Sequence, residues 1–238
     1  MRKERRIFRD QRVLLCIVIV VLSAVVGIIN PRFVRLNNIV AILQQISVLG
    51  VLTMAMSMLL ISGGIDLSIG NMMTLSGVVV ATLLMRGTSL PVAALAGVGV
   101  STLCGLLNGF IIAKSRTMPL IITLGTGQMF NGISLLIAGG SFLQFQNKLD
   151  FLRTIKLFDF LPLMVIFMLA IVLLMYVLLN KTRFGRYIYA VGGNSEASLW
   201  SGLNVDRIKI VVYLIMGVLT SIAGLIVASR LGSGQPSA

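Results

Sequence analysis

The chain has 238 residues, of which 57% are hydrophobic and only 11% are charged. A soluble domain carries about 25% charged residues, so this composition excludes a soluble globular protein and predicts a polytopic membrane protein. The sequence has no histidine and seven acidic residues. We therefore expect neither a metal site nor an enzymatic active site in this chain.

The basic residues lie in the gaps between apolar stretches, although the net charge of +13 would by itself suit a nucleic-acid partner. Six of the twenty basic residues fall within residues 1–12, and others cluster at 114–118 and 180–209. This distribution is typical of the cytoplasmic loops of membrane proteins. It predicts a multi-pass protein of the cell (cytoplasmic or inner) membrane with its N-terminus in the cytoplasm, and no nucleic-acid partner.

Seven apolar stretches approach the roughly 20 residues that a membrane-spanning helix needs. They predict an all-α transmembrane bundle that forms one domain over residues 1–238. The fourth stretch carries small residues at every fourth position, which predicts close helix packing on one face. The predicted spans are residues 13–29, 39–61, 68–85, 91–113, 119–138, 161–179 and 210–229.

A glycine-rich break that contains Asp66 interrupts the apolar sequence at residues 62–70. Asp66 is the only acid within residues 11–149. A charged side chain at membrane depth costs at least about 2.5–3.5 kcal/mol, so such residues usually have a role. Two compatible roles are open here, a structural one and a place in the translocation path.

In the structural interpretation, Gly63 or Gly64 ends one helix in the left-handed conformation, and Asp66 or Ser68 accepts backbone N–H bonds at the start of the next. In the other, the break and the amides of nearby spans line a path for an uncharged, polyhydroxylated solute, although the amides also suit interhelical hydrogen bonds. The candidate residues are Gly63, Gly64, Asp66, Ser68, Gly70, Asn108, Gln128 and Asn131.

The longest polar stretch, residues 180–209, lies between two predicted spans. Its Gly-Gly-Asn sequence predicts a turn, after which Asn194 or Ser195 caps a short helix that ends by Gly202. Such a helix outside the bilayer suits the docking of a soluble partner, whereas an ordinary loop is the alternative. Trp200 equally suits a membrane-interface anchor.

The segment at residues 139–160, predicted to lie outside, carries three basic residues, Lys148, Arg153 and Lys156. It suits either a solvated loop or a basic patch that steers an acidic partner. The sequence contains no G-x-x-x-x-G-K-[ST] pattern, so we expect no ATP site of the P-loop type in this chain.

Residues 63–70, GGIDLSIG, resemble the GGIDLSVG signature of ATP-binding-cassette permeases for monosaccharides of the ribose, xylose and galactose class. Further similarities follow along essentially the whole chain. The last of them resembles the EAA-x₃-G motif, which contacts the ATPase in this family and couples it to the permease. Ser198 and Leu199-Trp200 depart from that motif, which usually has a second alanine and Arg-Leu there. The matching positions are Asn108-Gly109, residues 123–126, 182–186 and 190–194, and Glu196, Ala197 and Gly202.

The resemblance implies a permease subunit that works with a cytoplasmic ATPase, an extracytoplasmic sugar-binding protein, a second permease copy (identical or different) and membrane lipid. It implies that ATP binds to the ATPase and that this chain holds no cofactor. The implied coupling residues are Gly192, Gly193, Asn194, Glu196, Ala197, Trp200 and Gly202.

Other functions also fit these residues. A branched-chain amino acid permease is the alternative within the same superfamily, and an ion-coupled secondary carrier is the alternative outside it. Members of the resembled family continue into a glycine-rich C-terminal third, so the chain is expected to lack that part.

Overall fold

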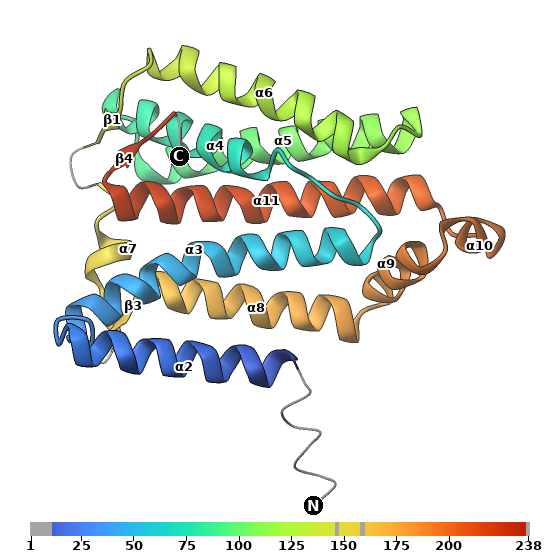
Figure 1. The fold of residues 1–238 in the computed structure, drawn as a ribbon. Helices are drawn as coiled ribbons and strands as arrows, with labels where there is room; N and C mark the ends of the chain where they lie inside the picture. Colours follow the sequence, from blue (N-terminus) through green and yellow to red (C-terminus); the bar gives the residue numbers. More distant parts are fainter. Residues whose placement is uncertain (1–10, 146–147, 158–159, 237–238) are drawn as a thin grey trace, which may run out of the picture. The chain divides into compact units, whose positions relative to one another are not determined.

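The structure is a computed structural model that describes residues 11–145, 148–157 and 160–236 (Figure 1). Most of the predicted basic N-terminus, residues 1–12, lies outside these ranges. Every predicted span is confirmed as a helix, with small shifts at the ends. The long helices are α2 (Gln11–Ile29), α3 (Leu36–Ile61), α4 (Ile69–Met85), α5 (Leu90–Ser115), α6 (Pro119–Ala138), α8 (Leu163–Lys181) and α11 (Val205–Leu231).

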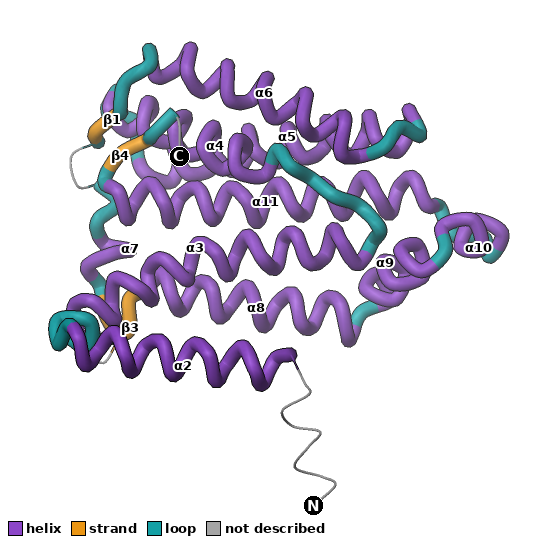
Figure 2. The backbone as a smooth tube through the Cα atoms, in the orientation of Figure 1, coloured by secondary structure: helices purple, strands orange, loops and turns teal. Residues whose placement is uncertain are grey.

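Five of the described helices, α3, α5, α6, α8 and α11, are long and apolar enough to cross a membrane. The apolar part of α2 and the 17-residue α4 are shorter. Figure 2 shows the reason for the short α4: after α3 ends, a loop runs back into the bundle, and α4 starts there. The predicted polytopic helical bundle is therefore confirmed, with an interrupted segment between α3 and α4.

Residues 1–43 and 44–238 form two compact units, which are described separately. In the first unit, a turn joins α2 to the start of α3, and the Asn38 side-chain amide donates to the Phe33 carbonyl (2.7 Å). The second unit contains the rest of α3 and all later elements. The prediction of a single domain over residues 1–238 stays a prediction.

The centre of the second unit is the close contact between α5 and α11. A Cβ placed on Gly109 would lie 2.8 Å from the Tyr213 Cβ, and one on Gly217 would lie 2.6 Å from the Ser101 carbonyl oxygen. Only glycine allows such a backbone approach, so the two helices pack through their small residues. The predicted stripe on the fourth span is thus a buried packing face, made of Ala93, Gly97, Ser101, Gly105 and Gly109.

The segment that follows α6 is folded onto the bundle rather than solvated. It contains β1 (Leu143–Gln144), α7 (Phe151–Thr154), β2 (Lys156–Leu157) and β3 (Leu161–Pro162). Strand β1 pairs antiparallel with β4 (Ser233–Gly234), and β2 pairs with β3. The apolar side chains Phe145, Leu149 and Leu152 are buried, and residues near the end of the described chain supply β4.

The predicted basic patch of this segment is also largely engaged. Lys148 Nζ donates to the Leu84 carbonyl at the end of α4 (2.8 Å), and Arg153 pairs with Asp150 (2.7 Å). The structure gives no such bond for Lys156 within its described ranges. Lys148 therefore ties the segment to α4, and Arg153 is neutralised by an acid of the segment itself, so two of the three cations do not form a free charged surface.

Candidate functional site

The break between α3 and α4 begins with a left-handed glycine. Gly63 has φ +79°, a conformation that L side chains rarely adopt. The Ser62 hydroxyl donates back to the Leu59 carbonyl at the end of α3 (2.6 Å). The predicted helix end is therefore confirmed at Gly63. Gly64, the other candidate, does not have a positive φ.

Asp66 is completely buried and organises the break through its carboxylate. Its Oδ1 accepts hydrogen bonds from both the backbone N–H and the hydroxyl of Ser68 (2.6 Å each). Its Oδ2 accepts from the Asn108 amide of α5 (2.9 Å), and the same amide donates to the Ser68 hydroxyl oxygen (2.9 Å). The structural role left open between Asp66 and Ser68 thus falls to Asp66, which satisfies a backbone N–H at the start of α4.

Two residues of neighbouring helices form further hydrogen bonds to the backbone of the break. The Tyr213 hydroxyl of α11 donates to the Ile65 carbonyl (3.0 Å), and the Thr123 hydroxyl oxygen of α6 accepts from the Leu67 N–H (3.1 Å). Tyr213 was not among the predicted site residues. The available signal was a tyrosine in an apolar helix, whose hydroxyl needs a partner when it is buried.

The predicted path residues separate into two groups. Asp66, Ser68 and Asn108 form one buried cluster at the break. Gln128 is exposed and Asn131 half-buried on α6, and the structure gives neither a hydrogen bond within its described residues. A Cβ on Gly70 would meet open space, so packing does not require glycine there.

The polar stretch at residues 180–209 folds into two helices, α9 (Arg183–Gly193) and α10 (Ser195–Trp200). The short helix and its Asn194 cap are confirmed, because the Asn194 side chain accepts from the Ala197 N–H (2.9 Å). The predicted Gly-Gly-Asn turn is wrong in part, since Gly192 and Gly193 are the last residues of α9. The preceding Thr182 caps α9 by accepting from the Gly185 N–H (3.0 Å), a cap that was not predicted.

Helix α10 presents its largest side chains outward. Trp200 is 83% exposed and Leu199 60% exposed, and Glu196 and Ala197 are exposed as well. A turn at Gly202 (φ +83°) then leads into α11, so the predicted end of the short helix is confirmed. Large exposed apolar side chains at the end of a helix bundle are typical of an interaction surface.

The end of α9 touches the break directly. A Cβ built on Gly192 would overlap the Ile61 carbonyl oxygen and lie 3.1 Å from the Ser62 carbonyl carbon, and one on Gly63 would lie 3.7 Å from the Gly192 Cα. The polar segment and the break are thus in backbone contact. A displacement of α9 cannot leave the end of α3 unaffected, because no flexible side chain separates them.

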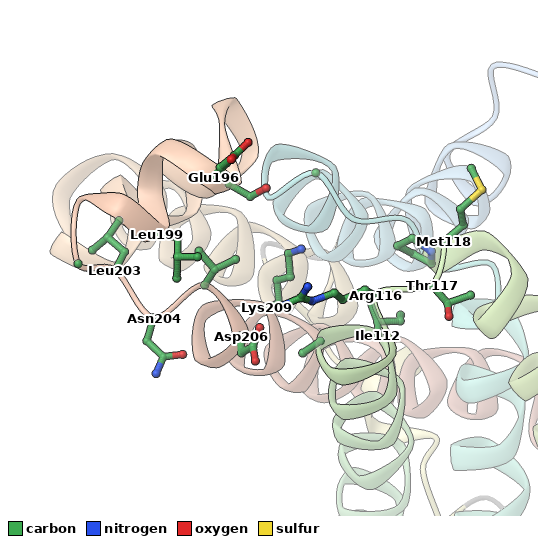
Figure 3. Close-up of a pocket in the computed structure, with 16 residues that line it drawn as sticks. Ile112, Arg116, Thr117, Met118, Glu196, Leu199, Leu203, Asn204, Asp206 and Lys209 are labelled. Atoms are coloured by element: carbon green, nitrogen blue, oxygen red, sulfur yellow. The ribbon is translucent and has the colours of Figure 1, made fainter.

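Beside α10 lies an open cavity of about 950 Å³, shown in Figure 3. Its walls come from the end of α5, the turn between α5 and α6, helix α10 and the first turn of α11. Within the described residues, no group of three His, Cys, Asp or Glu side chains could hold a metal ion.

The chain is thus a multi-pass membrane protein with a polar cluster buried at a helix break and a short, exposed helix at one end, features that suit a transport subunit. Residues 38–238 match the family described as "Branched-chain amino acid transport system / permease component", and the chain belongs to this family.

Several relatives of this chain are named as sugar permeases. The ribose import permease proteins of Escherichia coli (strain K12) and Bacillus subtilis (strain 168) are 36% and 35% identical, over 93% and 92% of this chain and 70% and 68% of theirs. The D-allose transport system permease protein of Escherichia coli (strain K12) is 35% identical over 93% of this chain and 68% of its own. No solved structure matches the chain.

Proposed function

We propose that the chain is the membrane-spanning subunit of an ATP-binding-cassette importer for a monosaccharide. The observation that carries the proposal is the set of relatives, which are named for ribose, D-allose, fructose and L-arabinose at 32–36% identity. All four are monosaccharides. The family description names branched-chain amino acids instead, so that substrate class is the alternative to test.

The buried cluster favours this proposal over an ion-coupled carrier. A coupling carboxylate exchanges its proton or ion during transport, whereas Asp66 is enclosed and accepts bonds from Ser68 and Asn108. Energy therefore enters from a separate cytoplasmic ATPase, which binds the ATP. The chain itself binds no cofactor and carries no enzymatic activity.

Uptake into proteoliposomes tests this function. We expect the chain, reconstituted with its ATPase and its sugar-binding protein, to take up a monosaccharide when ATP is supplied to the ATPase side. Uptake persists without any ion gradient. Uptake of leucine, isoleucine or valine instead, or uptake that needs a proton or sodium gradient and no ATP, contradicts the proposal.

The orientation of the chain follows from its charges. In Figure 1 the turn between α5 and α6 and helices α9 and α10 lie at one end of the second unit, and β1, β4 and α7 lie at the other. The first end carries the basic gaps 114–118 and 180–209, so it faces the cytoplasm together with the N-terminus. The described parts of 139–160 then face outward.

Cysteine labelling in intact cells checks this orientation. In a variant with Cys16 and Cys104 replaced by serine, Ala190→Cys on α9 should resist an impermeant maleimide, and Ser141→Cys should react. Both positions are exposed, so burial does not decide the result. Reaction of the cysteine at 190 from outside reverses the proposed orientation.

A second permease copy has a candidate contact on α6, which forms one edge of the second unit in Figure 1. Its outward face carries Gly125, Gln128 and Gly132, and a Cβ on either glycine would meet open space. An exposed amide in the middle of a span is unfavourable against lipid and favourable against another helix. By contrast, Leu103 on the exposed face of α5 is apolar, as lipid contact requires.

Bulky substitutions on the two faces separate dimer contact from folding. Gly125→Leu with Gly132→Leu should weaken self-association in bilayers about tenfold, as expected for the loss of about 1–2 kcal/mol of interhelical contact. Gly99→Leu on α5 is the matched control, because its Cβ also meets open space. Single-molecule counting of labelled subunits in vesicles reads the result, and equal effects of both sets exclude α6 as the contact.

A further inference from the structure

The cavity beside α10 is lined by two cations that have no carboxylate partner within the described residues. Arg116 and Lys209 both line it, and Figure 3 shows them on the side of the cavity opposite Glu196. The nearby carboxylate of Asp206 is already paired with Lys114 (3.0 Å). In the part of the chain that the structure describes, Arg116 and Lys209 have no carboxylate within 4.0 Å.

The backbone at Arg116 supports a role for this arrangement. Arg116 follows the last residue of α5 with φ 54°, and it is the one non-glycine residue with positive φ in the described ranges. A left-handed residue at this position is usually glycine, because a side chain costs about 1–2 kcal/mol there. Strain of this kind accumulates at functional sites.

Lys209 connects this cavity to a smaller one. The smaller hollow, of about 380 Å³, is lined by the end of α9 and shares Gly63, Ser195, Glu196 and Lys209 with the larger. The half-buried Lys209 therefore lies where the two hollows adjoin, next to the break and to α10. Apolar side chains complete the wall of the larger cavity, among them Ile112, Met118, Leu199 and Leu203.

We propose that this cavity is a second contact for the cytoplasmic ATPase, which inserts an acidic segment with apolar neighbours between α10 and the turn before α6. The inference rests on the proposed function. The cavity adjoins the exposed α10 through Leu199, so one partner can cover both. The cations Arg116 and Lys209 complement carboxylates of the entering segment, whereas Glu196 complements a cation, and this alternation fixes the orientation of the ATPase.

Charge reversal tests the inference on the whole permease in detergent or nanodiscs, with its own ATPase as the binding partner. Arg116→Glu with Lys209→Glu should lower the association rate at low salt at least tenfold and reduce its salt dependence. Arg116→Gln with Lys209→Gln should give a smaller loss. Lys181→Glu with Arg207→Glu is the control of equal charge change, since neither residue lines either hollow and both are exposed; its rate should stay within about threefold of the unmodified rate.

The variant Trp200→Ala separates this inference from the proposed function. If Trp200→Ala loses the ATPase while both Arg116 and Lys209 variants bind normally, the cavity contact is overturned and the coupling role of α10 stands. If none of the variants changes binding, both the cavity contact and the coupling role of α10 are overturned. Equal losses in the charge-reversal variant and its control show only a general effect of charge, which also overturns the cavity contact.

Discussion

Asp66→Leu should reduce transport to a few per cent at most, at equal abundance in the membrane. The substitution removes the acceptor for three donors, which are the N–H and hydroxyl of Ser68 and the amide of Asn108. An unsatisfied buried donor costs about 1–3 kcal/mol, so the three together approach the 5–15 kcal/mol that stabilises a typical domain. The start of α4 then loses its defined position inside the bundle.

Asp66→Asn should retain partial transport. The new amide keeps one oxygen for the Ser68 N–H, and the Asn108 side chain can rotate to accept from the new NH₂ group. Asp150→Asn is the control, because it removes an acid whose partner, Arg153, lies in the segment that follows α6, away from the break; a partly exposed pair contributes at most about 1 kcal/mol. Sugar uptake normalised to subunit abundance checks the series. Full uptake by Asp66→Leu excludes both the capping and the path role.

Gly192→Ala should abolish most transport while the ATPase still binds. The added methyl group overlaps the Ile61 backbone, and backbone atoms cannot move aside by changing rotamer. The end of α9 is then displaced from the break. Gly193→Ala is a close control, because its Cβ meets open space and both changes raise helix propensity by about 1 kcal/mol.

Trp200→Ala should instead weaken the binding of the ATPase, while the permease itself stays folded and stable. Trp200 is almost fully exposed, so its removal leaves no cavity in the fold. A buried aromatic anchor contributes about 2 kcal/mol or more to an interface, which corresponds to roughly a thirtyfold weaker affinity. Co-purification with the ATPase and ATP-driven uptake, measured in parallel, distinguish a loss of ATPase binding from a loss of coupling inside the permease.

Normal uptake by Gly192→Ala contradicts the view that the contact between Gly192 and Ile61 couples α9 to the break.

The helices and the ends of most of them could be predicted from the sequence, because local physics decides them. Apolar stretches of membrane length form helices in any bilayer context, and Asn194 caps α10 through residues only three positions away. The small-residue stripe on α5 was likewise readable, since positions i and i+4 share a helix face. The glycine signature at residues 63–70 similarly placed the break.

The tertiary structure alone decided which residues meet. The choice between Asp66 and Ser68 as acceptor depended on Asn108, 42 positions away, and the Tyr213 bond to Ile65 spans 148 positions. The outward position of Gln128 depended on which face of α6 packs against the bundle. The sequence does not encode such pairings in any local pattern, because they arise from close packing of helices that are distant in the chain. The contact of Gly192 with Ile61, which joins the polar segment to the break, belongs to the same class.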